Sequence, residues 1–137
     1  MPKVLTSPRF IVALIAVLFC LNLLGLVFHW YDTVSWLDNV HHTLGGFWIG
    51  VLGFYLVKIR PKLFVLPDTF WGSMIGVLAL AALAGVLWEI YEFVFYFMIV
   101  KVPPPLFGHA DTISDLCFDL FGAMVAVLLV KLPSFRK

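Results

Sequence analysis

Four long apolar runs constrain the fold of this chain more than any other feature of its sequence. They cover residues 9–29, 40–57, 70–97 and 112–130. A helix needs about 20 mainly apolar residues to cross the hydrocarbon core of a bilayer. Hydrophobic residues make up 63% of the chain and charged residues only 12%, which excludes an ordinary water-soluble domain. The pattern predicts a single all-α domain, residues 1–137, that forms an integral membrane bundle of four transmembrane helices.

The placement of the basic residues predicts the orientation of this bundle. Eight of the nine precede the first run, follow the fourth, or lie between the second and third: Lys3, Arg9, Lys58, Arg60, Lys62, Lys131, Arg136 and Lys137. Only Lys101 lies on the other side. Because basic residues favour the cytoplasmic side, we expect both termini in the cytoplasm and a multi-pass protein of the inner or plasma membrane. Membrane lipids are the expected partners, and the scattered basic residues do not support nucleic-acid binding.

Polar side chains gather at the outer end of the second run. Asp38, His41, His42 and Gly45 are separated by steps of three, four and seven residues, so they share one helix face. A capping box formed by Ser35 and Asp38 would explain the aspartate equally well. It would not explain two adjacent histidines, of which one should point into the bundle and the other partly away.

Two glutamates interrupt the third apolar run. Glu89 and Glu92 are three residues apart on one face, and more apolar residues follow them. An acid at this depth costs about 3 kcal/mol on insertion scales and usually marks a functional site. A snorkelling pair or a structural ion pair is the alternative, with Lys101 as the one basic residue on that side.

Three aspartates lie on one stripe at the start of the fourth run. Asp111 and Asp115 can be explained by the helix N-terminus, where acids cap free N–H groups and Thr112 and Asp115 match a capping box. Asp119 lies two turns into the helix, roughly 10 Å from the expected helix start, and is therefore beyond the reach of capping. It therefore needs a partner of another kind.

These three groups predict a shared polar pocket that binds a divalent metal ion. Gathered carboxylates repel one another unless they share protons or a cation. Helical bundles build metal sites from related Glu and Glu-x-x-His spacings. We expect Glu89 to act as a general base, and the expected metal ligands are Asp38, His41, His42, Glu92, Asp115 and Asp119. Oxygen and imidazole ligands suit zinc, manganese, iron or magnesium, and the sequence does not choose among them.

The same motifs resemble those of small YjdF-like membrane proteins and, more remotely, of the VanZ-like family. The resemblance covers about residues 36–126 and rests on Asp38 with His41 or His42, on Glu89 and Glu92, and on the aspartates before Gly122. It implies a polar core at one side of a helical bundle and names no substrate.

Three functions are compatible with such a pocket. The first is a metal-dependent enzyme that acts on a lipid or isoprenoid head group. The second is a proton- or cation-coupled transporter or permease component, which would need a homo-oligomer because four helices are few for a pathway. Gly46 and Gly50 would allow close helix contacts, inside the bundle or between chains. The third is an accessory membrane protein without catalytic activity.

Overall fold

A computed structural model of the chain describes residues 4–101 and 108–135, and all of its regular elements are helices. Four of them are long and apolar enough to cross a membrane, which confirms the prediction of an all-helical fold with four such segments. Lys3, Arg136 and Lys137, which contributed to the predicted orientation, lie outside the described residues. The elements are α1 (Pro8–Val27), α2 (Trp30–Thr33), α3 (Leu37–Ile59), α4 (Phe70–Phe95), its π-helical extension η1 (Tyr96–Val100) and α5 (His109–Phe135).

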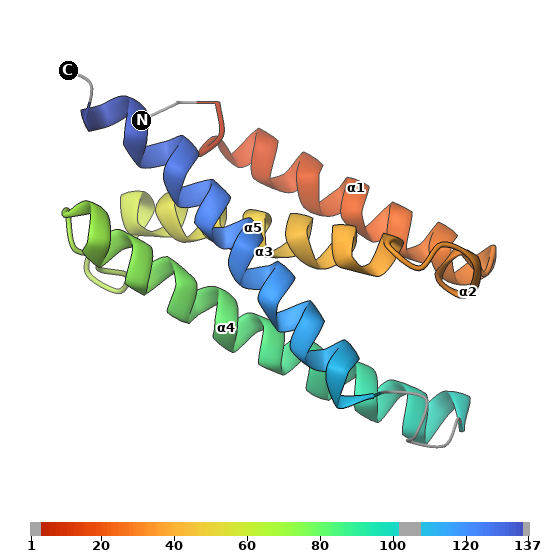
Figure 1. The fold of residues 1–137 in the computed structure, drawn as a ribbon. Coiled ribbons are helices and arrows are strands. Elements are labelled where there is room, and N and C mark those ends of the chain that lie inside the picture. The colour runs from red at the N-terminus through yellow and green to blue at the C-terminus, as the bar shows by residue number, and fades with distance from the viewer. Residues whose placement is uncertain (1–3, 102–107, 136–137) are drawn as a thin grey trace.

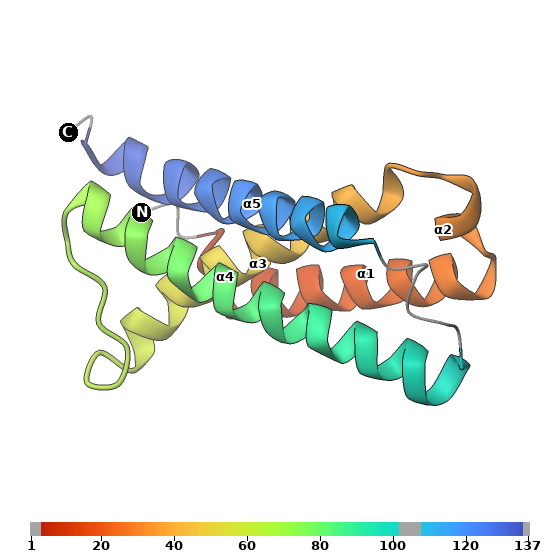
Figure 2. The ribbon, with the colours of Figure 1, turned by 60° about the horizontal axis from the view of Figure 1, so that its bottom comes forward.

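The four long helices run alternately up and down the bundle (Figure 1). α1 begins and α5 ends at the same end of the bundle, beside the loop that joins α3 to α4 (Figures 1 and 2). We call this end the α3–α4 end. The opposite end carries α2, the start of α3, the end of α4 and the start of α5, and we call it the α2 end.

The helix starts differ between the two ends. At the α3–α4 end, Ser7 and Thr69 cap α1 and α4, because their hydroxyl oxygens accept hydrogen bonds from the N–H groups of Phe10 and Gly72. At the α2 end, Trp36 precedes α3 without a side-chain cap. The alternative explanation of Asp38 by a capping box with Ser35 is therefore excluded, and Asp38 lies inside the first turn.

The start of α5 also differs from the expected position. The helix begins at His109, three residues earlier than predicted, because its backbone bonds already start at Gly108. Thr112 and Asp115 consequently lie within the helix and not at its cap. Capping therefore cannot explain why Asp115 is present.

Small residues bring α3 and α5 into close contact. A Cβ atom at Gly46 would overlap the backbone of Asp119, and one at Gly122 would overlap the backbone carbonyl of Thr43. Gly50 faces Ala126 in the same way. The predicted close contact of Gly46 and Gly50 thus occurs inside the bundle, and it brings the polar start of α3 against the polar part of α5.

The apolar core fills the half of the bundle near the α3–α4 end. Its members come from the second half of α3, the first half of α4 and the second half of α5, namely Phe54, Met74, Val77, Ala81, Ala123, Val127 and Val130. α1 packs mainly against α3, where Trp48 Nε1 donates a hydrogen bond to the carbonyl of Ile11. The other half of the bundle is where the predicted site residues lie.

Candidate functional site

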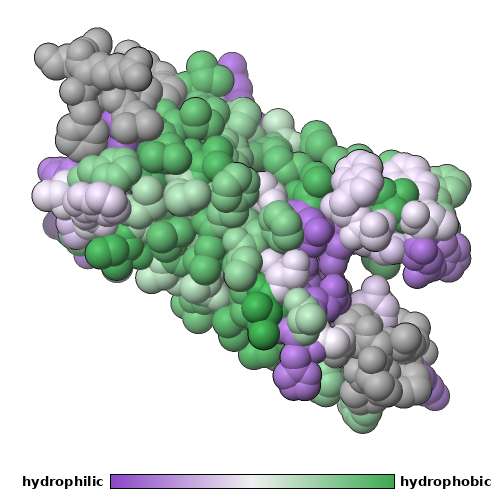
Figure 3. Space-filling view, viewed as in Figure 1, coloured by the Kyte–Doolittle hydropathy of each residue, from purple (hydrophilic) through white to green (hydrophobic). Residues whose placement is uncertain are grey.

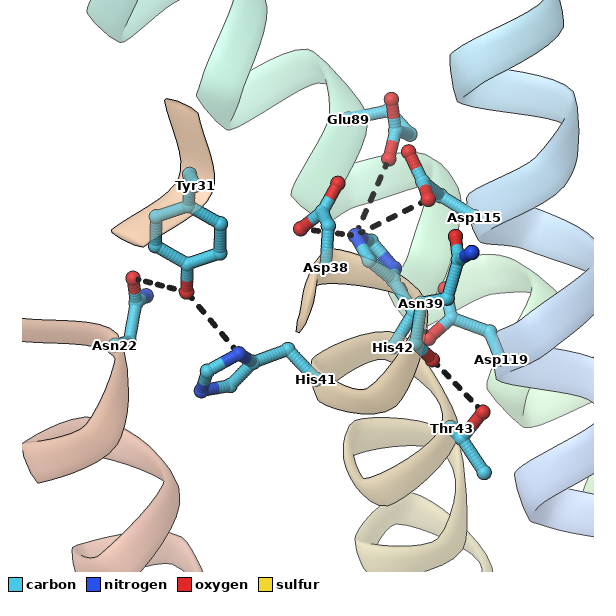
Figure 4. A network of polar contacts seen from close by, with 10 residues as sticks. All are labelled: Asn22, Tyr31, Asp38, Asn39, His41, His42, Thr43, Glu89, Asp115 and Asp119. Atoms are coloured by element: carbon cyan, nitrogen blue, oxygen red, sulfur yellow. Dashed lines mark hydrogen bonds and ion pairs between the residues drawn. The ribbon is translucent and has the colours of Figure 1, made fainter. Parts of the chain in front are cut away.

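His42 is the centre of a cluster of carboxylates from three helices (Figure 4). Its Nε2 lies 3.8 Å from Asp38 Oδ1, 3.9 Å from Glu89 Oε1 and 3.9 Å from Asp115 Oδ1. Its Nδ1 lies 3.4 Å from Asp119 Oδ1. We call these five residues the His42 cluster. The two ring nitrogens therefore face different groups: three carboxylates around Nε2 and one against Nδ1.

Most of the His42 cluster is buried although every member is ionisable. The side chains of His42 and Asp115 are only 4% and 3% exposed, and that of Asp119 is 10% exposed. Asp38, the most exposed member, is 35% exposed. Burying a charge is unfavourable unless it is paired and hydrogen-bonded. The cluster must therefore contain bound protons or a cation that offsets the charge of its carboxylates.

The carboxylates lack protein partners that could offset their charge. One buried oxygen of each of Glu89, Asp115 and Asp119 (Oε1, Oδ1 and Oδ2) has no hydrogen-bond partner. Within residues 4–101 and 108–135, the ion-pair contacts of the cluster's carboxylates are all to His42, and none is to a lysine or arginine. One imidazolium cannot balance four carboxylates. The donor set of carboxylate oxygens and one imidazole could hold a divalent cation, and bound protons could offset the same charge.

The spacing of the oxygens and nitrogen also fits a metal ion. Distances of 3.8–3.9 Å are too long for hydrogen bonds. Two atoms that each lie about 2.1 Å from one ion are about 3.4 Å apart in a tetrahedron and about 4.2 Å apart across the ion. Two overlapping sets have ligand atoms within 4.8 Å of one another: Asp38, His42 and Asp115, and His42, Glu89 and Glu92. The three distances of 3.8–3.9 Å from His42 Nε2 lie between these two values.

His41 lies apart from the His42 cluster. It faces α1 and α2, where its Nδ1 is 3.1 Å from the hydroxyl of Tyr31, which in turn donates a hydrogen bond to Asn22 Oδ1 (Figure 4). The structure thus brings together Asp38, His42, Glu89, Glu92, Asp115 and Asp119, and it leaves His41 in a separate network. Of the two adjacent histidines, His42 points into the bundle.

Sequence reasoning missed Tyr31 and Asn22. Burial, and then the nearby carboxyl groups of Asp38 and Glu92, raise the pKa of Tyr31, so that it stays a neutral hydrogen-bond donor. Gly25 leaves room for the tyrosine ring, since a Cβ atom there would lie 2.6 Å from it. Asn22, a lone amide in the first apolar run, was the available signal.

Sequence reasoning also missed Gly85. A Cβ atom at this position of α4 would overlap Asp119 Oδ2. Glycine therefore lets the carboxylate lie against the backbone of a neighbouring helix. No motif marks this role in the sequence, because it depends on the crossing of α4 and α5.

A cavity of about 490 Å³ adjoins the His42 cluster. Apolar side chains of α1, α3 and α4 form most of its wall. Its polar lining residues are Asn22, Tyr31, Asp38, His41, His42, Glu92 and Asp119. Figure 3 shows hydrophilic residues gathered beside a hollow at the α2 end, whereas the middle of this face is mainly apolar. A molecule in this cavity would touch both the carboxylates and the His41 network.

The fold and the cluster together define a four-helix membrane protein with an acidic, histidine-centred polar site. Residues 3–133 match the model of a family described as "Predicted membrane protein (DUF2238)", and the chain belongs to that family. It is 29% identical over 116 residues to a protein of Thermotoga maritima described as "Uncharacterized protein". The match covers 80% of this chain and 55% of that relative, so the chain spans about half of the relative's length. No solved structure matches the chain.

Proposed function

We propose that the protein is a divalent-metal-dependent membrane enzyme that acts on the head group of a lipid or isoprenoid compound. One observation carries this proposal: the Nε2 atom of buried His42 faces three carboxylate oxygens at 3.8–3.9 Å, with no basic side chain to offset them among the described residues. The YjdF-like resemblance is compatible with this proposal, and the VanZ-like resemblance stays a prediction.

Asp38, His42 and Asp115 would hold the ion, with Glu92 as a further ligand from α4. A bound divalent ion would supply Lewis-acid stabilisation of charge on a substrate oxygen. Glu89 has a buried oxygen without a partner and lies at the same ring nitrogen, so it is suited to accept a proton from an attacking water. The predicted role of Glu89 as general base is therefore retained.

Asp119 takes a different role from the one expected of it. It lies at Nδ1 of His42, on the side of the ring opposite the three carboxylates. Histidine ligands of metals usually donate their other N–H to a carboxylate, which fixes the tautomer and the ring orientation. We therefore propose that Asp119 positions His42 and does not ligate the ion.

The apolar core favours this function over transport. A pathway through one chain would have to continue from the His42 cluster towards the α3–α4 end. Buried side chains of all three packed helices fill that half, including Val77, Val127 and Val130, each with no exposed surface. Transport would then require an oligomer with a pathway between chains.

We propose that the protein lies in an inner or plasma membrane, with its α2 end facing away from the cytoplasm. Its partners are then membrane lipids, and it could form a homo-oligomer. Cysteine labelling tests the orientation at positions on opposite ends of the bundle. Arg60→Cys should be protected from a membrane-impermeant reagent in intact cells, and Asp32→Cys should react. The reverse pattern would contradict the orientation without affecting the site.

Metal analysis of detergent-purified protein tests the function itself. After incubation with zinc, manganese, iron or magnesium and removal of the excess, we expect one of these ions to remain in a stoichiometric amount. A chelator should then lower the melting temperature. Protein that retains none of the four ions, and whose melting temperature does not respond to them, would contradict the proposal.

A further inference from the structure

The cavity beside the His42 cluster has a mainly apolar wall. Leu18 and Phe19 of α1, Trp48 and Ile49 of α3, and Ala84 of α4 contribute to it. Its volume of about 490 Å³ falls in the usual range for ligand pockets, roughly 300–1,000 Å³. Such a wall suits an apolar ligand, whereas a hydrated ion or a sugar would gain little from it.

Two exposed lining residues indicate that the cavity opens sideways between α1 and α4. Phe19 of α1 is 67% exposed and Trp88 of α4 is 41% exposed, although both line the cavity. Both residues lie within helices that are apolar enough to span a membrane. The medium at this mouth is therefore lipid, and a hydrocarbon chain can enter without passing through water.

The polar part of the cavity offers a hydrogen-bond acceptor to a ligand. Tyr31 donates its single hydroxyl proton to Asn22, so the contact with His41 requires Nδ1–H of His41 to donate to the tyrosine oxygen. The lone pair of a neutral His41 is then on Nε2. That atom is buried and has no partner, while its ring lines the cavity.

We propose that the cavity binds one hydrocarbon chain of a membrane lipid, and that a hydroxyl of the lipid's head group donates a hydrogen bond to His41 Nε2. The chain lies among α1, α3 and α4, and the head group lies between His41 and the His42 cluster. This inference rests on the proposed function for the metal-assisted chemistry of the head group. The binding of the chain is measured independently of any metal.

Native mass spectrometry of the detergent-purified full chain with lysophosphatidylglycerol tests the proposal. This probe has one hydrocarbon chain, a phosphate and free hydroxyls. We expect saturable binding to the wild type and at least tenfold weaker binding to Ala84→Phe, whose ring fills the cavity. The matched control Ala79→Phe adds the same ring at an exposed position of the same helix and should bind as the wild type does.

Two further variants, Ala16→Phe and His41→Leu, test the cavity and the hydrogen bond separately. If Ala84→Phe does not fold, Ala16→Phe fills the cavity from an exposed position of α1. His41→Leu should bind the probe several-fold more weakly. Equal binding of the probe by the wild type and by a folded cavity variant would overturn the inference. So would a wild-type protein that forms a stable dimer and binds no probe, because a second copy would then cover the cavity. Lipid binding without retained metal would contradict the proposed function and leave this inference standing.

Discussion

The two ends of the bundle differ in whether their buried polar groups have hydrogen-bond partners. At the α3–α4 end, Lys131 donates a hydrogen bond to the carbonyl of Asp68 and lies over the ring of Phe54, while Ser73 donates to the carbonyl of Pro67. At the α2 end, Glu89 and Asp115 each keep a buried oxygen without a partner. The buried polar groups at the first end are therefore hydrogen-bonded within the chain, whereas those carboxylate oxygens at the second end are not.

This difference is what the proposed function explains. An unsatisfied buried polar group costs about 1–3 kcal/mol, and more if it is charged. Several such groups at one place would destabilise a bundle that gains nothing from them. On the proposed function, a bound cation offsets this cost. Variants at the α2 end should therefore change metal affinity, and variants at the α3–α4 end should not.

Replacing His42 should have the largest effect. His42 belongs to both sets of possible ligand atoms, so His42→Ala should weaken metal binding by at least about 100-fold. Titration of the purified, metal-free protein would measure the affinity. The adjacent His41→Ala is the matched control and should retain the metal. Equal losses in both variants would show that the distinction between the two histidines is wrong.

Asp119→Asn should reduce metal affinity by about 10- to 100-fold, because the amide is a weaker acceptor for Nδ1–H of His42. The protein should still insert into the membrane. If Asp119 has only a structural role, the variant should be as stable as the wild type or more stable, since a neutral amide is easier to bury than a charge. Unchanged metal content with raised stability would therefore disprove its positioning role.

Gly85→Ala tests the site at the α2 end without replacing a charged residue. The added methyl group would displace the carboxylate of Asp119, and we expect about tenfold weaker metal binding. Gly53→Ala is the control, because its Cβ would meet only the end of the Leu80 side chain, at 3.2 Å. Both variants gain up to about 1 kcal/mol of helix propensity. A loss of metal in both would point to a general disturbance of packing.

Lys131→Met tests the other end of the bundle. The methionine keeps much of the apolar stem but loses the hydrogen bond to Asp68, so the free energy of unfolding should fall by about 1–2 kcal/mol. Metal content should not change. A denaturant titration in detergent measures the first quantity, and metal analysis of the same sample measures the second. Loss of metal in this variant would mean that the two ends are coupled.

The sequence was sufficient to predict the four helices that are long enough to span a membrane, their apolar character and the acidic positions that share helix faces. It could not predict that Asp119 and Asp115 lie at different nitrogens of His42, because this depends on how closely α3 and α5 approach at Gly46 and Gly122. The network of His41 and Tyr31 was also missed, since it requires the chain reversal at α2. Periodicity locates a residue on its own helix, whereas crossing distances decide which residues meet.

Asp111→Asn should have the smallest effect of all. Asp111 was expected to precede the helix and cap it. Instead, α5 begins at His109, and Asp111 lies exposed in its first turn. What remains is the favourable interaction of a negative charge with the helix N-terminus, about 0.3–1 kcal/mol. Asp111 is absent from both sets of possible ligand atoms, so metal affinity should equal that of the wild type.

Measured beside Asp119→Asn and Glu92→Gln, this variant defines where the site ends along α5. A loss of metal as large as that of Asp119→Asn would extend the site to the start of the helix. Small and equal effects in all three variants would instead mean that the carboxylates at the α2 end are as structural as Lys131 is at the other end.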